Sequence, residues 1–480
     1  MLANKLTILL RSNLKLLGVF FAIVSILFVC NYFYFETDYL WITKGGEWIL
    51  KNHQIPRVDI WSYTLSDYPW IFHEWGSGVI AYLISSNVGY WAMVLLGSVM
   101  MTVAMLINSP KKFIYRYYVV YLIAAILLAL PMAGFRPQQF SFLFVAIYFA
   151  LYIKYFKNKT ISWLIPIPII MALWVNLHGG FFLGLAVGLY MILTKFAQRI
   201  GLFSKLGFIS KPTKRDFIIL TCTLVVTFLA SLLNPYGIHI YREVYNTLFA
   251  ISVPISEWSP TANWIIIIAY GLFVAITTIV RRKIPVEILL ACYVGLASLL
   301  IQKFISLFII ISLYPFCLGL SEVSKSVRSN RLEFIANKSR KWFILMFVLI
   351  LLAAIRFSLS KSWDMPVGAV EYLKTQPAPG KKMINNYGWG GYLVTNYPEQ
   401  KVFIDGRMAS WREKDRFLAR DFLLITLGIK PNSWLFDQYG VDWAILYIQK
   451  DKKIIEGLSQ STDWQELYRD NVSVIYRKTN

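Results

Sequence analysis

Long apolar runs recur throughout the first 360 residues of the chain, and they constrain the fold more than any other feature. Such a run can cross a bilayer only as a helix, because a helix satisfies its backbone hydrogen bonds internally. Hydrophobic residues make up 57% of the chain, which favours a membrane protein over a soluble one. The runs predict eleven transmembrane helices, near residues 16–35, 90–109, 117–134, 139–154, 162–177, 181–196, 216–233, 263–280, 285–301, 304–321 and 342–359.

The distribution of basic residues predicts the orientation of these helices. Residues 1–360 hold 31 basic and 12 acidic residues, whereas residues 361–480 hold 17 and 14. The excess lies in the N-terminus and in alternate short loops, which the positive-inside rule places in the cytoplasm. It explains the net charge of +22 without nucleic-acid binding. Residues 1–360 therefore form a predicted transmembrane domain, whose first outward loop spans 36–89 and includes a short interfacial or re-entrant helix at 74–88.

The first outward loop begins with the sequence FETDYLWITKGGEWI. Glu36 and Asp38 thus follow the first predicted helix at once. Apolar residues then recur at helical spacing over 41–50, which predicts an amphipathic helix at the membrane surface. A carboxylate held beside that helix can accept a proton from a hydroxyl group, so Asp38 is the first candidate for a general base.

The segment FHEW supplies a second acid in the same loop. Glu74 can act as a second catalytic acid, bind a metal or hydrogen-bond a sugar, and His73 can line the same site. The chain has no H-E-x-x-H motif, which argues against zinc. Carboxylates prefer hard divalent cations such as Mg²⁺ and Mn²⁺. The candidate ligands are Asp38 and Glu74, with Glu36 and Asp59 as further oxygen donors.

Cationic and polar side chains lie at the outward ends of other predicted helices. An Arg guanidinium suits phosphate through two parallel hydrogen bonds, and a Lys ammonium acts as a point charge. Taken singly, each of these cations also fits a side chain that extends to the membrane interface. The residues predicted to bind an anionic head group are Arg136, His178, Arg242 and Lys303, and the residues predicted to line the same cavity are Glu36, Asn176, Glu257 and Trp258.

Residues 361–480 follow a different pattern, in which short apolar runs alternate with helical ones. This alternation predicts a small α/β domain. The expected strands are 381–386, 401–405, 442–448, 464–470 and 472–478, and the expected helices are 367–374, 411–426 and 433–439.

Two glycine-containing motifs of this domain have alternative interpretations. NNYGWGGYL does not match the spacing of a nucleotide-binding loop. Its aromatic residues suit stacking on a sugar, while its glycines suit a turn that opens a helix. In FIDGR, Asp405 and Arg407 are close enough in sequence to pair with each other.

The pattern TDYLWITKGGEWILKNHQIPRVDIWSYT, followed by WIFHEW, resembles the first outward loop of the GT-C superfamily of integral-membrane glycosyltransferases. NLHGG, NPYG and WGGYL with FIDGR resemble a GT-C-like group of bacterial membrane proteins. The resemblance implies a polytopic α-helical membrane protein with a small C-terminal α/β domain. It also implies sugar transfer from a polyprenyl-phosphate-linked donor at the outer face of the bacterial cytoplasmic membrane, with the catalytic acid at Asp38. Some members have a different acidic pair, or D-x-D, where this chain has ETD.

The resemblance implies a mechanism for these residues. Asp38 would deprotonate an acceptor hydroxyl on a glycan, a lipid or a protein, and the hydroxyl oxygen would attack the anomeric carbon. Arg136 and Lys303, with Arg242 or His178, would stabilise the departing polyprenyl phosphate. The C-terminal domain, expected outside the cytoplasm, would cap the cavity or select the acceptor.

Two other function classes fit the pattern of spans. A transporter or flippase for a lipid-linked glycan would use an outward cavity, but transporters often show paired repeats and broken helices at mid-membrane. A non-catalytic protein that assembles a surface glycan would keep the fold without turnover. Turnover by the purified chain would distinguish the enzyme from both.

Overall fold

The computed structural model describes residues 2–32, 37–129, 134–201, 212–249, 260, 264–277, 285–326, 365–413 and 416–479. The chain divides into two compact units. We call the first the helical unit; it comprises Met1–Tyr34, Val88–Gly237 and Ile255–Ser362. The second, the loop–tail unit, comprises Phe35–Asn87, Ile238–Pro254 and Trp363–Asn480. The first outward loop therefore belongs to the same unit as the C-terminal tail.

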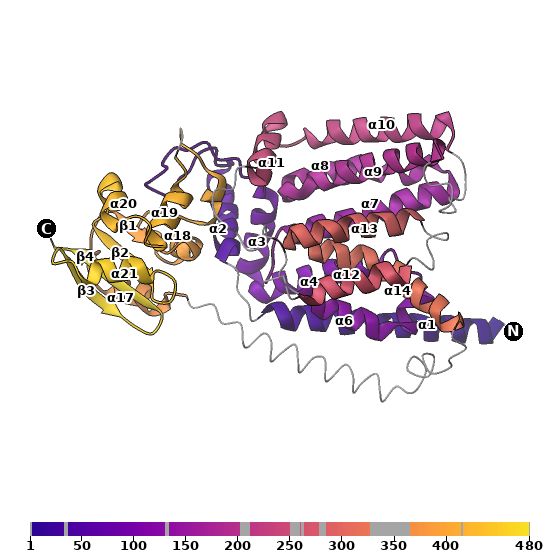
Figure 1. Cartoon of the computed structure of the whole chain (residues 1–480), viewed down its shortest axis with the longest axis horizontal. Coiled ribbons are helices and arrows are strands. Elements are labelled where there is room, and N and C mark those ends of the chain that lie inside the picture. The colour runs from indigo at the N-terminus through magenta and orange to yellow at the C-terminus, as the bar shows by residue number, and fades with distance from the viewer. Residues whose placement is uncertain are drawn as a thin grey trace. The chain divides into compact units, whose positions relative to one another are not determined.

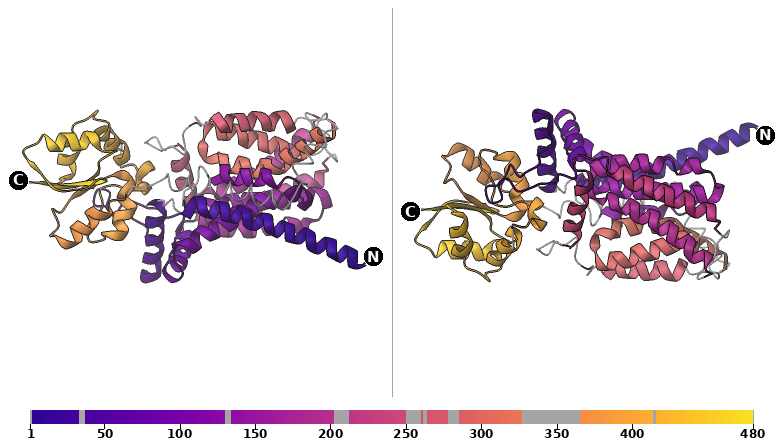
Figure 2. Two further views of the ribbon diagram at one scale, coloured as in Figure 1. Left: turned by 90° about the horizontal axis from the view of Figure 1, so that it is seen from below. Right: turned by 90° about the horizontal axis from the view of Figure 1, so that it is seen from above.

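The helical unit is a bundle whose helices run side by side (Figures 1 and 2). Helix α1 packs against α4 and α6, α8 packs against α10, and α13 packs against α14. The helices of this unit are α1 (Leu2–Tyr32), α4 (Tyr90–Leu106), α5 (Lys111–Arg116), α6 (Tyr118–Ala129), α7 (Gln138–Asn158), α8 (Pro166–Leu177), α9 (Phe182–Arg199), α10 (Lys214–Ser231), α12 (Trp264–Thr277), α13 (Pro285–Leu300) and α14 (Ile305–Ser326).

Four helical stretches of the described residues are long and apolar enough to cross a membrane. Four shorter apolar helices accompany them, in agreement with a multi-pass membrane protein. The predicted span at 342–359 lies outside the described residues, and the count of eleven stays a prediction. The four long stretches are Asn13–Tyr32, Gln138–Asn158, Gly179–Arg199 and Gln302–Ser324, and the shorter helices are Tyr90–Leu106, Tyr118–Ala129, Ile161–Leu177 and Val286–Leu300.

The first outward loop contributes two helices to the loop–tail unit, α2 (Thr37–Asn52) and α3 (Trp75–Asn87), at the positions that the sequence predicts. They cross where Gly46 and Gly78 meet, and a Cβ atom on Gly46 would overlap the backbone of Gly78. Glycine is therefore needed at this crossing. A third helix, α11 (Ile240–Phe249), joins the unit from the middle of the chain.

The tail contains a four-stranded sheet in the order β1-β2-β4-β3. Strand β1 pairs with β2 in parallel, and the other two pairings are antiparallel. Helices lie on both faces of the sheet (Figure 2), which explains why every residue of β2 is buried. The strands are β1 (Met383–Asn385), β2 (Trp443–Tyr447), β3 (Trp464–Arg469) and β4 (Ser473–Lys478), and the helices are α17 (Val367–Thr375), α18 (Gly390–Asn396), α19 (Leu418–Thr426), α20 (Asn432–Tyr439) and α21 (Lys452–Ser459).

One hydrophobic core joins the loop to the tail. Trp41, Trp70 and Phe72 of the loop belong to the same buried cluster as Phe403 and Trp411 of the tail. Burial of apolar area stabilises by about 25 cal/mol per Å², so shared aromatic surface strongly favours a single folding unit. The loop is thus part of the domain that the tail forms.

Two of the predicted elements in the tail are wrong in detail. Residues 401–405 form no strand, because the Val402 N–H donates to Trp61 O (3.0 Å) and the Phe403 N–H donates to the Asn385 side chain (2.9 Å). The predicted helix at 411–426 begins only at Leu418, after an extended Phe417. In the first case the apolar run has strand length, but Val402 pairs with the distant loop instead of with a strand of the sheet.

Candidate active site

Asp38 lies in the first turn of α2, where the helix dipole favours a negative charge. Its Oδ1 accepts a 3.0 Å hydrogen bond from the indole Nε1 of Trp41 on the same helix. Trp41 is buried against Trp70 and Phe72, with ring centroids 6.3 and 5.9 Å away. The aromatic core of the loop therefore orients a carboxylate that is itself half-buried.

The tail packs its backbone directly against this turn of α2. A Cβ atom on Gly406 would overlap Asp38 Oδ1, and a Cβ atom on Gly391 would lie 2.5 Å from the Thr37 carbonyl oxygen. Only glycine permits both approaches. Gly390 and Gly391 also open α18, which confirms the helix-opening interpretation of this motif.

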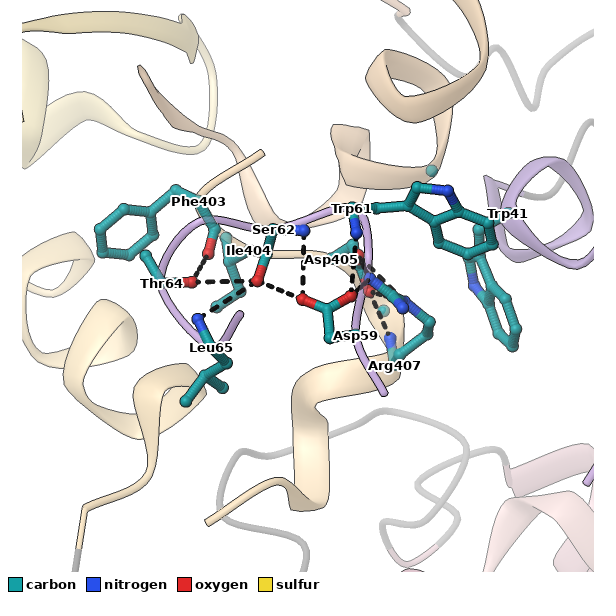
Figure 3. Close-up of polar contacts among 12 residues, drawn as sticks. Trp41, Asp59, Trp61, Ser62, Thr64, Leu65, Phe403, Ile404, Asp405 and Arg407 are labelled. Carbon is teal, nitrogen blue, oxygen red and sulfur yellow. Dashed lines mark hydrogen bonds and ion pairs between the residues drawn. The ribbon is translucent and has the colours of Figure 1, made fainter. Parts of the chain in front are cut away.

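A buried ion cluster connects the loop to the tail beside this site (Figure 3). Asp405 and Arg407 pair as their spacing predicts, with Nε–Oδ1 at 2.9 Å and Nη2–Oδ2 at 2.6 Å. Asp59 of the loop lies 2.8 Å from the same Nη2. The three side chains are at most 1% exposed, so the guanidinium neutralises two carboxylates away from water.

Three indole rings surround the Arg407 guanidinium. Its Cζ lies 4.6 Å from the ring of Trp61, 4.7 Å from Trp70 and 5.0 Å from Trp411, distances suited to cation–π attraction. Burial opposes the charge of the guanidinium, but the two carboxylates outweigh it and raise the pKa of Arg407. Among the described residues, no group accepts a hydrogen bond from its Nη1. On that side the guanidinium is therefore stabilised by the indole rings.

Asp59 is committed to this cluster rather than to a metal. Its Oδ1 accepts from the Trp61 N–H at 3.2 Å, and its Oδ2 accepts from the Ser62 N–H at 3.1 Å and from the Ser62 hydroxyl. Within the part of the chain that the structure describes, no group of three or more His, Cys, Asp or Glu side chains could hold a metal ion. Asp38 and Glu74 therefore do not form a complete Mg²⁺ or Mn²⁺ site with described residues.

Glu74 belongs to a second group of titratable side chains in the loop–tail unit. His73 Nε2 lies 3.7 Å from Glu74 Oε1, and His73 Nδ1 lies 4.0 Å from Oε1 of Glu243 on α11. The exposed Arg242 neighbours Glu243 on the same helix. Burial raises the pKa of Glu243, and the nearby Glu74 adds to the rise while His73 and Arg242 oppose it.

Replacing Glu243 with glutamine is expected to stabilise the protein at pH 8 and to have no effect near pH 4. In the folded protein the pKa of Glu243 lies above its ordinary value of 4.5. The stability that the protonated Glu243 contributes is therefore fully present below pH 4.5 and is lost as the pH rises through the folded-state pKa. Glutamine does not ionise and avoids the loss. Thermal unfolding of Glu243→Gln between pH 4 and pH 8, with the exposed Glu399→Gln as control, measures the difference. A variant less stable than wild type at pH 8 would contradict the prediction.

In the helical unit, His178 caps the short helix η2 (Gly179–Phe181). Its Nδ1 accepts from the Gly180 N–H at 2.9 Å and lies 2.7 Å from the Ser141 hydroxyl. Ser141 in turn accepts from the Trp174 Nε1–H at 2.7 Å. An acceptor role for Nδ1 places the ring proton of a neutral His178 on Nε2, which makes Nε2 a donor. A Cβ atom on Gly180 would lie 2.7 Å from Nδ1, so the second glycine of NLHGG is required for this geometry.

Replacing Ser141 with alanine is expected to destabilise the helical unit by about 1–3 kcal/mol, because the buried Trp174 N–H loses its acceptor. The matched control is Ser98→Ala, since Ser98 is also buried and its hydroxyl donates at 2.8 Å to the Val94 carbonyl oxygen of its own helix. Thermal unfolding of the detergent-solubilised variants compares them. Equal melting temperatures for the two variants would refute the role of Ser141.

The remaining predicted site residues are distributed between the two units. Arg136 lies two residues before α7, whose first turn carries Ser141, so Arg136 and His178 lie at the same end of the bundle. Asn176 donates to Leu233 O at 2.8 Å and ties α8 to the end of α10. Lys303 lies in η7 (Gln302–Phe304) before α14. Glu36, Glu257 and Trp258 lie outside the described residues.

The residues that sequence reasoning missed are the partners of the predicted ones. No local pattern connects Asp59 or the indoles of Trp61 and Trp70 with Arg407, because they come from opposite ends of the chain. The spacing of two positions between Asp405 and Arg407 was the one feature of the sequence that indicated part of this cluster. The density of tryptophan in DIWSYT and WIFHEW indicated an aromatic cluster without indicating its cation.

The fold resembles that of a solved archaeal oligosaccharyltransferase, AglB from Archaeoglobus fulgidus, in complex with an inhibitory peptide and a dolichol-phosphate. The TM-score is 0.56, and the two sequences are 14% identical over an alignment that covers 92% of this chain and 69% of the other. At this identity the likeness concerns the fold alone. No protein-family model and no curated protein sequence matches the chain.

Proposed function

We propose that the chain is a membrane glycosyltransferase that moves a sugar from a polyprenyl-phosphate-linked donor to an acceptor hydroxyl. The observation that carries the proposal is the placement of Asp38 in the first turn of α2. Trp41 orients its carboxylate, and Gly391 and Gly406 of the tail pack against the same turn. A carboxylate in this position can act as a general base. The dolichol-phosphate in the archaeal structure of similar fold supports a lipid-linked donor, and its peptide supports a separate acceptor molecule.

In the proposed reaction, Asp38 takes the proton of the acceptor hydroxyl. The hydroxyl oxygen forms a bond to the anomeric carbon, while the bond from that carbon to the phosphate oxygen breaks. The electron pair leaves with the polyprenyl phosphate, whose charge Arg136 and Lys303 are proposed to stabilise. His178, as an Nε2–H donor, and Arg242 are further proposed partners of the phosphate, and Glu74 is proposed to hydrogen-bond the sugar or acceptor.

The proposal includes a location. The basic loops favour an N-terminus in the cytoplasm, and the first loop and the domain at 361–480 are then proposed to face outward from a bacterial cytoplasmic membrane. A site at that surface suits a donor whose polyprenyl chain stays in the bilayer. The tail, packed against the turn that holds Asp38, is proposed to select the acceptor, whether glycan, lipid or protein.

Turnover by the purified chain tests the proposal against its rivals. The full-length protein in proteoliposomes is supplied with polyprenyl-phosphate-linked sugars and acceptor candidates, and products are identified by mass spectrometry. Transfer supports the enzyme, whereas movement of the intact donor across the bilayer without transfer would indicate a flippase. In cells, surface glycans of a deletion strain and an Asp38→Ala strain should lack the same sugar; a normal glycan in the Asp38→Ala strain would reject the proposed site.

A further inference from the structure

A cavity of about 580 Å³ lies at one end of the helical unit, between α5 and the C-terminal half of α14. Lys112, Phe113 and Arg116 of α5 line one side, and Tyr314, Ser321 and Glu322 of α14 line the other. None of these residues belongs to the proposed transferase site. The six-residue α5 separates the apolar helices α4 and α6, so the cavity lies where helices of membrane type end.

The polar side of the cavity carries a net positive charge. Lys112 and Arg116 provide two cations against the one carboxylate of Glu322. Lys112 is exposed and forms no ion pair with any residue that the structure describes, while its Nζ lies 5.3 Å from the Phe113 ring. The buried Ser321 adds a neutral hydroxyl to the lining. This combination of an ammonium, a guanidinium and a hydroxyl is suited to phosphate oxygens.

The other side of the cavity is apolar. The rings of Phe113 and Tyr314 meet edge to face at a centroid distance of 5.6 Å, and Leu318 continues the same wall along α14. A small inorganic anion has no apolar group that could contact these side chains. A lipid would use both sides, with its headgroup on the cations and the start of an acyl chain on the rings.

We propose that this cavity binds the phosphate headgroup of an anionic phospholipid. Basic pockets between transmembrane helices recognise such headgroups, and aromatic side chains favour the depth at which headgroups lie. Lys112 and Arg116 contact the phosphate, and Phe113, Tyr314 and Leu318 contact the first carbons of the tail. The site is distinct from the one proposed for the sugar donor and does not depend on the proposed reaction.

Lys111 and Lys112 form a matched pair for the test. They are adjacent, exposed and equally charged, but Lys111 hydrogen-bonds Asn13 at 3.1 Å and does not line the cavity. The full-length chain is purified in mild detergent with phosphatidylglycerol or phosphatidylcholine, and retained lipid is measured by native mass spectrometry. We expect retention of phosphatidylglycerol, a roughly ten-fold weaker affinity in Lys112→Glu, and near wild-type affinity in Lys111→Glu.

Three results would overturn the proposal. Equal weakening in the two variants would indicate general surface attraction, and equal retention of phosphatidylcholine would show that the phosphate charge is not recognised. Displacement of the lipid by millimolar inorganic phosphate or glycerol 3-phosphate would identify a site for a free anion instead. Lys112→Gln repeats the comparison with a smaller expected loss if charge reversal prevents folding.

Discussion

Replacing Arg407 with alanine is expected to destabilise the loop–tail unit by about 3–5 kcal/mol, because Asp59 and Asp405 would lose the cation that they share. The penalty is large because both carboxylates are fully buried, so water cannot solvate the charges that the variant leaves unpaired. The three indoles around the guanidinium would also border an empty volume. Thermal unfolding measures the loss, and hydrogen exchange should increase in the loop and in the segment around Gly406.

Arg420→Ala is the matched control, since Arg420 is 48% exposed and lies 3.5 Å from its nearest carboxylate, Asp421. A surface pair of this kind contributes at most about 1 kcal/mol. Arg407→Lys should lie between the two, because it keeps the charge but loses the planar, bidentate geometry. If Arg407→Ala melted at the same temperature as Arg420→Ala, the cluster would not be what connects loop and tail.

Replacing Asp38 with asparagine is expected to lower sugar transfer by about 10²–10⁴-fold, the range that a general base contributes. Asparagine keeps an oxygen that can accept the Trp41 indole N–H, so the local fold should persist. The loss should therefore appear in kcat without a change in melting temperature. Transfer is measured with the purified variant and a defined lipid-linked sugar.

Two controls separate chemistry from position. Asp67→Asn removes an exposed acid of the same loop, at a backbone φ of 64° that asparagine tolerates, and should leave transfer unchanged. Trp41→Phe keeps an aromatic ring but loses the N–H, and should lower kcat less than Asp38→Asn does. Full activity in Asp38→Asn would refute its assignment as the base.

Local features of the structure could be predicted from the sequence because they depend on neighbouring residues. Helical spacing over 41–50 indicated α2, and the adjacency of Asp405 and Arg407 indicated their ion pair. Likewise, the glycines of WGGYL indicated the turn that opens α18. In each case the interacting groups lie within a few positions of each other.

Long-range features could not be predicted, because periodicity carries no information on distant partners. The apolar run at 401–405 has the length of a strand, but Val402 pairs with Trp61 of the loop. NLHGG indicated a functional histidine, although nothing in it indicated the hydroxyl of Ser141, which fixes the ring. For the same reason, the sequence assigned Asp59 to a cation site rather than to Arg407.

The shared core of loop and tail has a consequence for biosynthesis. Thr64 and its acceptor, the Phe403 carbonyl, are 339 positions apart in the chain and 2.6 Å apart in space. At about 5–20 residues per second, a ribosome needs roughly 20–70 s to make the second partner after the first. During that interval the tryptophans of the loop have no core to enter and Asp59 has no counter-ion. We therefore expect the loop to reach its final packing only after the last quarter of the chain has been made.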